Sequence, residues 1–294
     1  MPPKSRNLIF TSAGDNSVVL ENWLAPNGNY DIMVCYYGES AETFAKFSQS
    51  VEYCFQRKGA KYQNLKFLFE KYPEIFEAYD YFFLLDDDII FDGVSGINKL
   101  FELIKRLNLW VVAPTFKRDG SSKISHPITK QRPQFHYRYT NFFETGVPLV
   151  SKEVLMKFLK VYDEPILGWG VDYMITWSMD PQATNKYVLV DEVAVINPFD
   201  EAKANGREMA KLPISSLTQE QEDWEAFKKE KGIAELAHRN YKLIPKRKFF
   251  LKELLKRWRR IVTGQKQVPR IGLGAWSTLL TCLKNLTIEP LEHG

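Results

Sequence analysis

Between residues 7 and 200, short runs of apolar, β-branched and aromatic residues alternate with segments whose apolar residues recur three and four positions apart. This alternation predicts strands joined by helices, and it restricts the chain to a mostly parallel sheet covered by helices. The predicted strands are 8–11, 31–37, 81–85, 109–114 and 187–190, and the predicted helices are 64–70, 96–107 and 152–162, the last capped by Ser151. The predicted fold class is therefore α/β and Rossmann-like, with a mixed sheet flanked by helices.

The composition changes near residue 198, and the chain becomes polar and charged. Residues 218–221 have the form of a capping box, which predicts the start of a helix at Thr218. We therefore predict a catalytic domain at 1–200, a helical extension at 201–240 and a basic amphipathic tail at 241–294. Residues 242–270 hold eleven Lys or Arg and one acid, an excess of +10 that leaves about −6 for the rest.

In the basic tail, apolar residues of segment 246–262 recur at helical spacing opposite Lys and Arg. The pattern predicts an amphipathic helix that either binds an anionic membrane surface or packs on the domain. No nucleic acid is expected as a partner, because no zinc-finger, glycine-rich RNA or helix-turn-helix pattern accompanies the basic residues.

The expected location follows from segments that the sequence lacks. No apolar run is long enough to cross a membrane, and the first predicted strand begins too early to leave room for a signal peptide. The three cysteines show no paired spacing for zinc or disulfides. We expect a cytoplasmic protein, free or attached peripherally at the inner face of a membrane.

One predicted strand ends in three adjacent carboxylates, Asp86, Asp87 and Asp88, which we call the acidic triplet. Side chains alternate along an extended chain, so Asp86 and Asp88 can project to the same side. Ligands of α/β sheets bind beyond the carboxyl ends of the strands. Because carboxylate oxygens suit Mn²⁺ or Mg²⁺, the triplet predicts a metal site that bridges phosphates. The alternative is an acidic turn or a helix N-cap.

The acidic triplet resembles the Asp-x-Asp motif of nucleotide-sugar glycosyltransferases with the GT-A fold. The chain is more closely similar to domain-of-unknown-function family 707, glycosyltransferase-like proteins of plants and bacteria, in five ordered stretches: 58–64, 79–89, 136–139, 168–172 and 188–191. The resemblance implies a GT-A-like fold, a nucleotide-sugar donor, a divalent metal and a hydroxyl acceptor on a glycan or lipid-linked glycan. It also implies an inverting displacement.

The donor-binding residues that the resemblance implies lie mostly near strand ends: Ser12, Asp15, Lys61, Asn64, Asp86, Asp87, His136 and Arg138. Lys61 and Asn64 are one helical turn apart and can face one group. An arginine suits bidentate phosphate contact, although Arg138 can instead hold the aromatic residues around it. For Ser12 and Asp15 the alternative is an ordinary strand-to-helix turn.

Residues 168–172, with the sequence Gly-Trp-Gly-Val-Asp, resemble the acceptor loop of inverting GT-A enzymes. The resemblance implies that Trp169 and Gly170 line the acceptor site, with Glu144 nearby, and that Asp172 is the general base. Asp172 is the single candidate because Val171 replaces the first acid of the usual pair. Alternatively, Asp172 caps a helix at 173–177.

The implied metal ligands are Asp86, Asp88 and Asn197, at whose position the family often has His. An amide oxygen is a weaker, neutral ligand, which also suggests a non-catalytic nucleotide-sugar-binding protein. A metal-dependent phosphatase or phosphotransferase that attacks phosphorus through Asp86 is the other alternative. Such enzymes usually carry the acidic motif on their first strand, whereas two predicted strands precede it here.

Overall fold

The computed structural model describes residues 6–199 and 217–247. The chain forms two compact units, Met1–Pro245 and Lys246–Gly294, and nearly all described residues belong to the first. Segment 246–262 lies outside the described residues apart from its first two, so its attachment to a membrane stays a prediction. Within the described ranges, no helix is long and apolar enough to span a bilayer.

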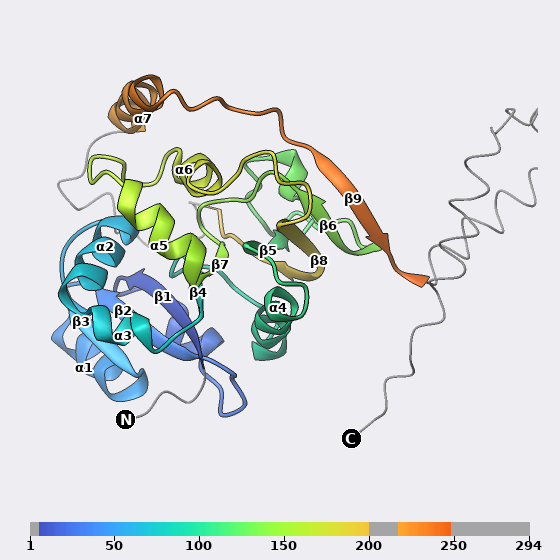
Figure 1. Cartoon of the computed structure of the whole chain (residues 1–294). Coiled ribbons are helices and arrows are strands. Elements are labelled where there is room, and N and C mark those ends of the chain that lie inside the picture. Colours follow the sequence, from blue (N-terminus) through green and yellow to red (C-terminus); the bar gives the residue numbers. More distant parts are fainter. Residues whose placement is uncertain (1–5, 200–216, 248–294) are drawn as a thin grey trace, which may run out of the picture. The chain divides into compact units, whose positions relative to one another are not determined.

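A nine-stranded sheet with the order β3-β2-β1-β4-β7-β5-β8-β6-β9 forms the centre of the first unit (Figure 1). The strands are β1 (Asn7–Ala13), β2 (Asp31–Tyr36), β3 (Tyr53–Gln56), β4 (Tyr81–Leu84), β5 (Val111–Phe116), β6 (Phe135–Thr140), β7 (Leu149–Ser151), β8 (Tyr187–Val195) and β9 (Asn240–Pro245). Parallel pairing joins β1 to β2 and β4, β2 to β3, and β5 to β8. Antiparallel pairing joins β7 to β4 and β5, and β6 to β8 and β9. The predicted α/β class with a mixed, mostly parallel sheet is confirmed.

Helices cover both faces of this sheet. They are α1 (Ala41–Ser50), α2 (Lys61–Lys71), α3 (Pro73–Glu77), α4 (Val94–Arg106), α5 (Lys152–Val161), α6 (Val171–Trp177) and α7 (Leu217–Lys231), with the short turns η1 (Val19–Trp23) and η2 (Pro127–Thr129). On β4, Phe82 stacks on Phe76 of α3, whereas Phe83 contacts Phe101 of α4. Neighbouring side chains of a strand point to opposite faces, so α3 and α4 cover opposite faces. Strands β1, β2 and β5 are buried throughout, as expected for a sheet covered on both sides.

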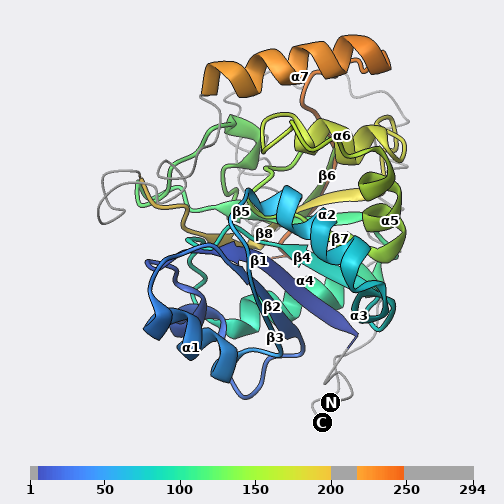
Figure 2. The ribbon, with the colours of Figure 1, turned by 90° about the vertical axis from the view of Figure 1, so that its left-hand side faces the viewer.

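The face opposite α4 carries the elements that position the candidate site. Tyr62 of α2 packs edge-on against Phe158 of α5, with ring centroids 5.7 Å apart. Ser151 caps α5 as predicted, because its hydroxyl accepts a hydrogen bond from the backbone N–H of Val154. Helix α7 lies beside α6 (Figure 2), where Trp224 stacks on Tyr173 at 6.0 Å.

The region after residue 200 differs from the predicted division. Strand β9 pairs with β6 and forms one edge of the sheet. The first unit runs to Pro245, so the predicted boundary at residue 200 falls within this unit. The predicted helix is present as α7 and begins at Leu217, one residue before Thr218. The sequence did not reveal β3, β6, β7 and β9, because β7 has three residues and the others are partly exposed, which weakens the apolar signal.

Candidate functional site

The acidic triplet lies at the carboxyl end of β4. Asp86 is separated from the end of the strand by one residue, and its backbone N–H donates to the carbonyl of Gly146 at 2.9 Å. Asp87 Oδ2 accepts a hydrogen bond from the backbone N–H of Gly14 at 2.9 Å, in the loop that follows β1. The triplet therefore sits where two neighbouring parallel strands end, the usual place for ligands of α/β sheets.

Lys61, at the start of α2, is held against the first carboxylate of the triplet. Its Nζ lies 2.6 Å from Asp86 Oδ1, and it also donates to the carbonyls of Leu84 and Thr145 at 3.1 and 2.9 Å. The side chain is nearly buried, and three oxygen partners satisfy the ammonium group. Asp86 is thus engaged by a fixed cation, and Lys61 connects the triplet to the turn at Thr145.

The other predicted donor-binding residues of this region hold the loops together. Asn64 is fully buried, and its amide donates to Ser12 Oγ and to the carbonyl of Gly59, both at 3.0 Å, while accepting from Arg57. A direct donor contact by Asn64 is therefore wrong, because its polar atoms are used inside the fold. Asp15 accepts hydrogen bonds from the Tyr36 hydroxyl and from two backbone N–H groups that precede α1.

A backbone bridge joins the two chain segments that carry Asp88 and Asn197. Ile90 and Ile196 exchange antiparallel backbone hydrogen bonds of 3.0 and 2.9 Å, which places the backbone of Asn197 across from that of Ile89, the residue after Asp88. A carboxylate and an amide oxygen fit a hard divalent ion. Among the described residues no group of three or more His, Cys, Asp or Glu could hold a metal. A pair of protein oxygens still fits Mg²⁺, which commonly uses one or two carboxylates together with substrate phosphates.

Asp172, the predicted base, is the second residue of α6. Gly170 occupies the N-cap position, so the alternative that Asp172 caps this helix is wrong. The carboxyl group is 8% exposed, and Oδ1 accepts a hydrogen bond of 2.9 Å from the backbone N–H of Tyr173. Burial is the main cause that raises the pKa of Asp172 to about 7. The hydrogen bond from the Tyr173 N–H and the charge of His126 lower this pKa, whereas the charge of Glu144 raises it. A carboxyl group that titrates near neutrality is suited to general base catalysis.

Tyr62 relates this carboxyl group to the acidic triplet. Its hydroxyl is buried and donates to the carbonyl of Thr145 at 2.6 Å, the same carbonyl that Lys61 contacts. Burial raises the pKa of Tyr62 well above its ordinary value, and the charges of Asp86 and Asp172 raise it further. The charges of both carboxylates therefore act on the same hydroxyl, which supports treating them as parts of one candidate site.

The sequence did not reveal two histidines beside Asp172. His126 Nδ1 lies 2.9 Å from Glu144 Oε1, and His238 stacks on Phe142 with ring centroids 3.8 Å apart. His238 Nε2 is 2.9 Å from the hydroxyl of Tyr173. Neither histidine belongs to a motif. The one feature of the sequence that could have drawn attention to them is that the chain has only four histidines. Their positions give weight to Glu144, which pairs with His126 and whose charge raises the pKa of Asp172.

The two predicted donor-binding residues of β6 face other partners. Arg138 is fully buried, and its Nε donates to Asp191 Oδ2 at 2.7 Å. The remaining guanidinium contacts are Asp191 Oδ1, Asn240 Oδ1 and the carbonyls of Ile128 and Lys130. A phosphate contact by Arg138 is therefore wrong. His136 pairs with Glu192 at 2.5 Å, and Glu192 also binds Lys99 of α4.

The two predicted acceptor-binding residues of the loop 168–172 differ in exposure. Trp169 is 47% exposed and lies three residues before Asp172, and its contact with an acceptor stays a prediction. Gly170 has a φ of +83°, and a Cβ added to it would meet the ring of Trp224 at 2.2 Å. Gly170 therefore supports the packing of α7 and is not available to an acceptor.

Gly170→Ala should destabilise the protein by roughly 2–4 kcal/mol, because the methyl group overlaps the Trp224 ring and the backbone is left-handed. The midpoint of urea unfolding measures the effect. Gly168→Ala is the matched control, since a Cβ at Gly168 meets nothing within 4 Å. Equal stability of the two variants would contradict the packing described here.

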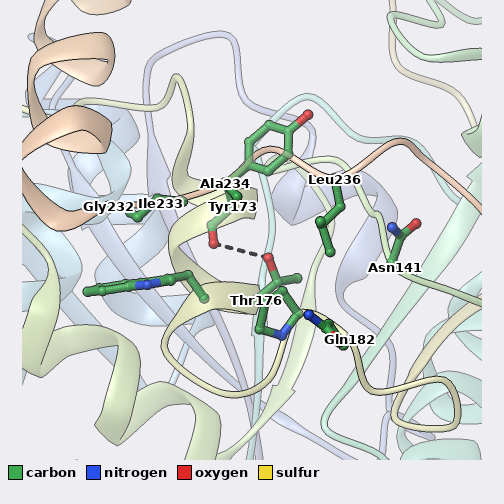
Figure 3. Close-up of a pocket in the computed structure, with 10 residues that line it drawn as sticks. Asn141, Tyr173, Thr176, Gln182, Gly232, Ile233, Ala234 and Leu236 are labelled. Atoms are coloured by element: carbon green, nitrogen blue, oxygen red, sulfur yellow. Dashed lines mark hydrogen bonds between the residues drawn. The ribbon is translucent and has the colours of Figure 1, made fainter.

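A pocket lies between α6 and the segment 232–236 (Figure 3). Its volume is about 190 Å³, and its lining includes Tyr173, Thr176, Trp177 and Ile233. The Thr176 hydroxyl is already bonded to the carbonyl of Tyr173 at 3.0 Å. Asp172 does not line this pocket, and its size is below that of ordinary ligand sites. We therefore place the candidate site at the acidic triplet and Asp172.

The fold and these carboxylates define an α/β protein with an acidic candidate site at the ends of its parallel strands. The model of the family described as "Protein of unknown function (DUF707)" matches residues 15–247, and the chain belongs to this family. No curated protein matches the chain.

Several solved structures are similar to part of the chain. TarS from S. aureus (residues 1–349) is 7% identical, with a TM-score of 0.47, over 65% of this chain and 59% of TarS. GalNAc-T7 with UDP, GalNAc and Mn²⁺ is 12% identical, with a TM-score of 0.48, over 76% of this chain and 49% of that one. Glucosyl-3-phosphoglycerate synthase from Mycobacterium tuberculosis is 14% identical, with a TM-score of 0.48, over 79% of this chain and 80% of the synthase. The chain thus spans little more than half the length of TarS.

Proposed function

We propose that the protein is a glycosyltransferase that moves a sugar from a nucleotide-sugar donor to a hydroxyl acceptor on a glycan or lipid-linked glycan. The observation that carries the proposal is a pair of carboxylates: Asp86, bound by Lys61 at 2.6 Å beyond the end of β4, and the buried Asp172 at the start of α6. One belongs to a triplet at a strand end, which suits a donor diphosphate, and the other is a buried carboxyl group suited to accept a proton. The order of the matching motifs supports the same function.

On the donor side, Asp88 and Asn197 are the residues that would hold a divalent ion, Mn²⁺ or Mg²⁺. When bound, such an ion supplies positive charge for the departing nucleoside diphosphate. Asp86 was predicted as a further ligand, and we assign it a different part because Lys61 already binds its Oδ1. The Lys61–Asp86 pair fixes the loop that carries Asp88, and Asp87 ties that loop to the end of β1.

On the acceptor side, Asp172 takes the proton of the attacking hydroxyl group. The acceptor oxygen forms a bond to the anomeric carbon, the bond from that carbon to the donor phosphate breaks, and the nucleoside diphosphate leaves with the bonding electrons. Attack opposite the leaving group inverts the anomeric centre. The exposed ring of Trp169 provides a surface on which a sugar can stack.

A non-catalytic nucleotide-sugar-binding protein is the second candidate, because Asn197 is a weak metal ligand. Such a protein would bind the donor both in its wild-type form and as the Asp172→Ala variant, and neither form would release nucleoside diphosphate. The phosphatase alternative predicts instead that a simple phosphate ester is hydrolysed. An assay with both substrates separates the three functions.

In a thermal-shift screen, a uridine or guanosine diphosphate sugar should raise the melting temperature only when Mn²⁺ is present, and Asp88→Ala should abolish the rise. A donor at 100 times its Kd adds about 2.7 kcal/mol, which amounts to a rise of about 5–11 °C for a domain of this size. Asp92→Ala is the matched control, because Asp92 lies nearby but pairs with Lys117 at the surface. An undiminished metal-dependent rise in Asp88→Ala would disprove the assignment of the metal ligand.

A further inference from the structure

Glu144 holds the imidazole of His126 in one orientation. Glu144 Oε1 lies 2.9 Å from His126 Nδ1 and also accepts from the backbone N–H of His126 at 3.2 Å and from Thr129 Oγ1 at 3.3 Å. The ring of His126 packs on Phe142, with centroids 4.6 Å apart. Because Nδ1 is engaged by a carboxylate, the imidazole is fixed and its charged form is favoured.

A second set of contacts attaches this pair to α6. The His238 ring stacks on Phe142 and lies 5.4 Å from the His126 ring. The same His238 makes the 2.9 Å contact with the hydroxyl of Tyr173, the residue after Asp172. The loop at 126–129 and the turn at 142–145 are therefore packed, through His238, against the first turn of helix α6, which carries Asp172.

The charged groups of this cluster act on one another. The pKa of Asp172 is raised by the charge of Glu144 and lowered by that of His126, and the charge of Asp172 in turn raises the pKa of Tyr62. The hydrogen bond to Glu144 raises the pKa of His126, burial lowers it, and the charges of Glu144 and Asp172 raise it again. The pKa of His238 is lowered by burial and by His126, so His126 is the ring that favours the cationic form. Without that cation, the repulsion between the charges of Glu144 and Asp172 would have no compensation from His126.

We propose that Glu144 and His126 form a positioning dyad for Asp172, in which Glu144 fixes the imidazole and the positive charge of His126 stabilises the carboxylate form of Asp172. The proposal rests on the proposed function, since that function gives Asp172 the part of the base. It assigns His126 and Glu144 a part that the motifs do not contain. Its electrostatic content can be measured on the full chain without substrate.

The first measurement is the titration of the histidine ring resonances by NMR, with His126 assigned through the resonance that His126→Gln loses. The midpoint of His126 should move to lower pH in Glu144→Gln and also in Asp172→Asn, because each variant removes a negative charge that faces the ring. The control is His136→Gln, which removes the other His–Glu pair and should leave the His126 midpoint unchanged. An unchanged midpoint in Asp172→Asn would overturn the dyad, whatever the activity.

The second measurement is the pH dependence of donor hydrolysis, with water as the acceptor and the nucleotide sugar that gives the largest thermal shift as the probe. In His126→Gln the acid limb of the rate profile should move to higher pH, with the KM for the donor unchanged, because Asp172 loses a cation that favours its charged form. An acid limb in the wild-type position would overturn the dyad. If the wild type hydrolyses no donor, the proposed function fails, and the NMR midpoints alone decide the dyad.

Discussion

Asp172→Asn should lower the rate of sugar transfer by about 10²- to 10⁴-fold, the range that a positioned general base contributes. An amide has the shape of the carboxyl group but cannot accept the acceptor's proton. Asp172 is nearly enclosed by its neighbours, so the variant keeps the site filled. Release of nucleoside diphosphate, with the KM for the donor as a second readout, measures the loss. The donor KM should hardly change, because Asp172 lies on the acceptor side.

The raised pKa of Asp172 determines the direction in which the wild-type rate changes with pH. The pKa of Asp172 is raised to about 7, mainly by burial, so the group is protonated and inactive below that value. The wild-type rate should therefore rise with pH through about pH 7, with about a tenth of the active form left one pH unit lower. The residual rate of Asp172→Asn should lack this limb. A variant that keeps both the rate and the limb would show that another group is the base.

Measurements of stability distinguish this loss of activity from unfolding of the variant. Because the folded-state pKa of Asp172 lies above its ordinary value of 3.8, the folded protein binds the proton more tightly than the unfolded chain does. The corresponding stability is complete below about pH 4 and is lost as the pH rises through about 7. Asp172→Asn removes this titration and should be at least as stable as the wild type at pH 8. Melting temperatures at pH 5 and pH 8 test this.

The sequence was a good guide to the buried centre of the molecule. Strands β1, β2, β4, β5 and β8 were predicted because both faces of each are covered by helices or neighbouring segments, which forces apolar runs. The acidic triplet was placed at a strand end for the same reason, since its carboxylates interrupt one of these runs. Local patterns of this kind are independent of the rest of the chain.

The roles that depend on distant partners could not be derived from the sequence. Arg138 looked suited to a phosphate because no local pattern shows that Asp191, 53 residues later, takes its guanidinium. Gly170 looked like part of an acceptor site because the Trp224 ring that covers it comes from a helix beyond the motif. His126 and Glu144 are 18 residues apart, and their pairing depends on how two loops pack. Such contacts are set by tertiary structure alone.

Arg138→Met should destabilise the protein by about 3–5 kcal/mol, the cost of removing one partner from a buried ion pair. Both side chains are fully buried, and the two carboxylate oxygens of Asp191 bind the guanidinium at 2.7 and 3.2 Å. The variant leaves Asp191 buried without this guanidinium, with the hydrogen bond of 2.6 Å from the backbone N–H of Arg132 still in place. The midpoint of urea unfolding measures the loss, and Lys99→Met is the control, because its partner Glu192 lies near the surface and such pairs contribute about 0–1 kcal/mol.

The double variant Arg138→Met with Asp191→Leu should recover much of this stability. The cost in the single variant comes mainly from the uncompensated charge of Asp191, and replacing a buried pair by apolar residues of similar volume is often neutral. A lower pH should also make the single variant more stable, because protonation removes the charge of Asp191. Burial already raises the pKa of Asp191, and the loss of Arg138 raises that pKa further. A double variant as unstable as Arg138→Met would mean that Arg138 stabilises the sheet mainly through its bonds to Ile128, Lys130 and Asn240, which join the loop before β6 to the start of β9.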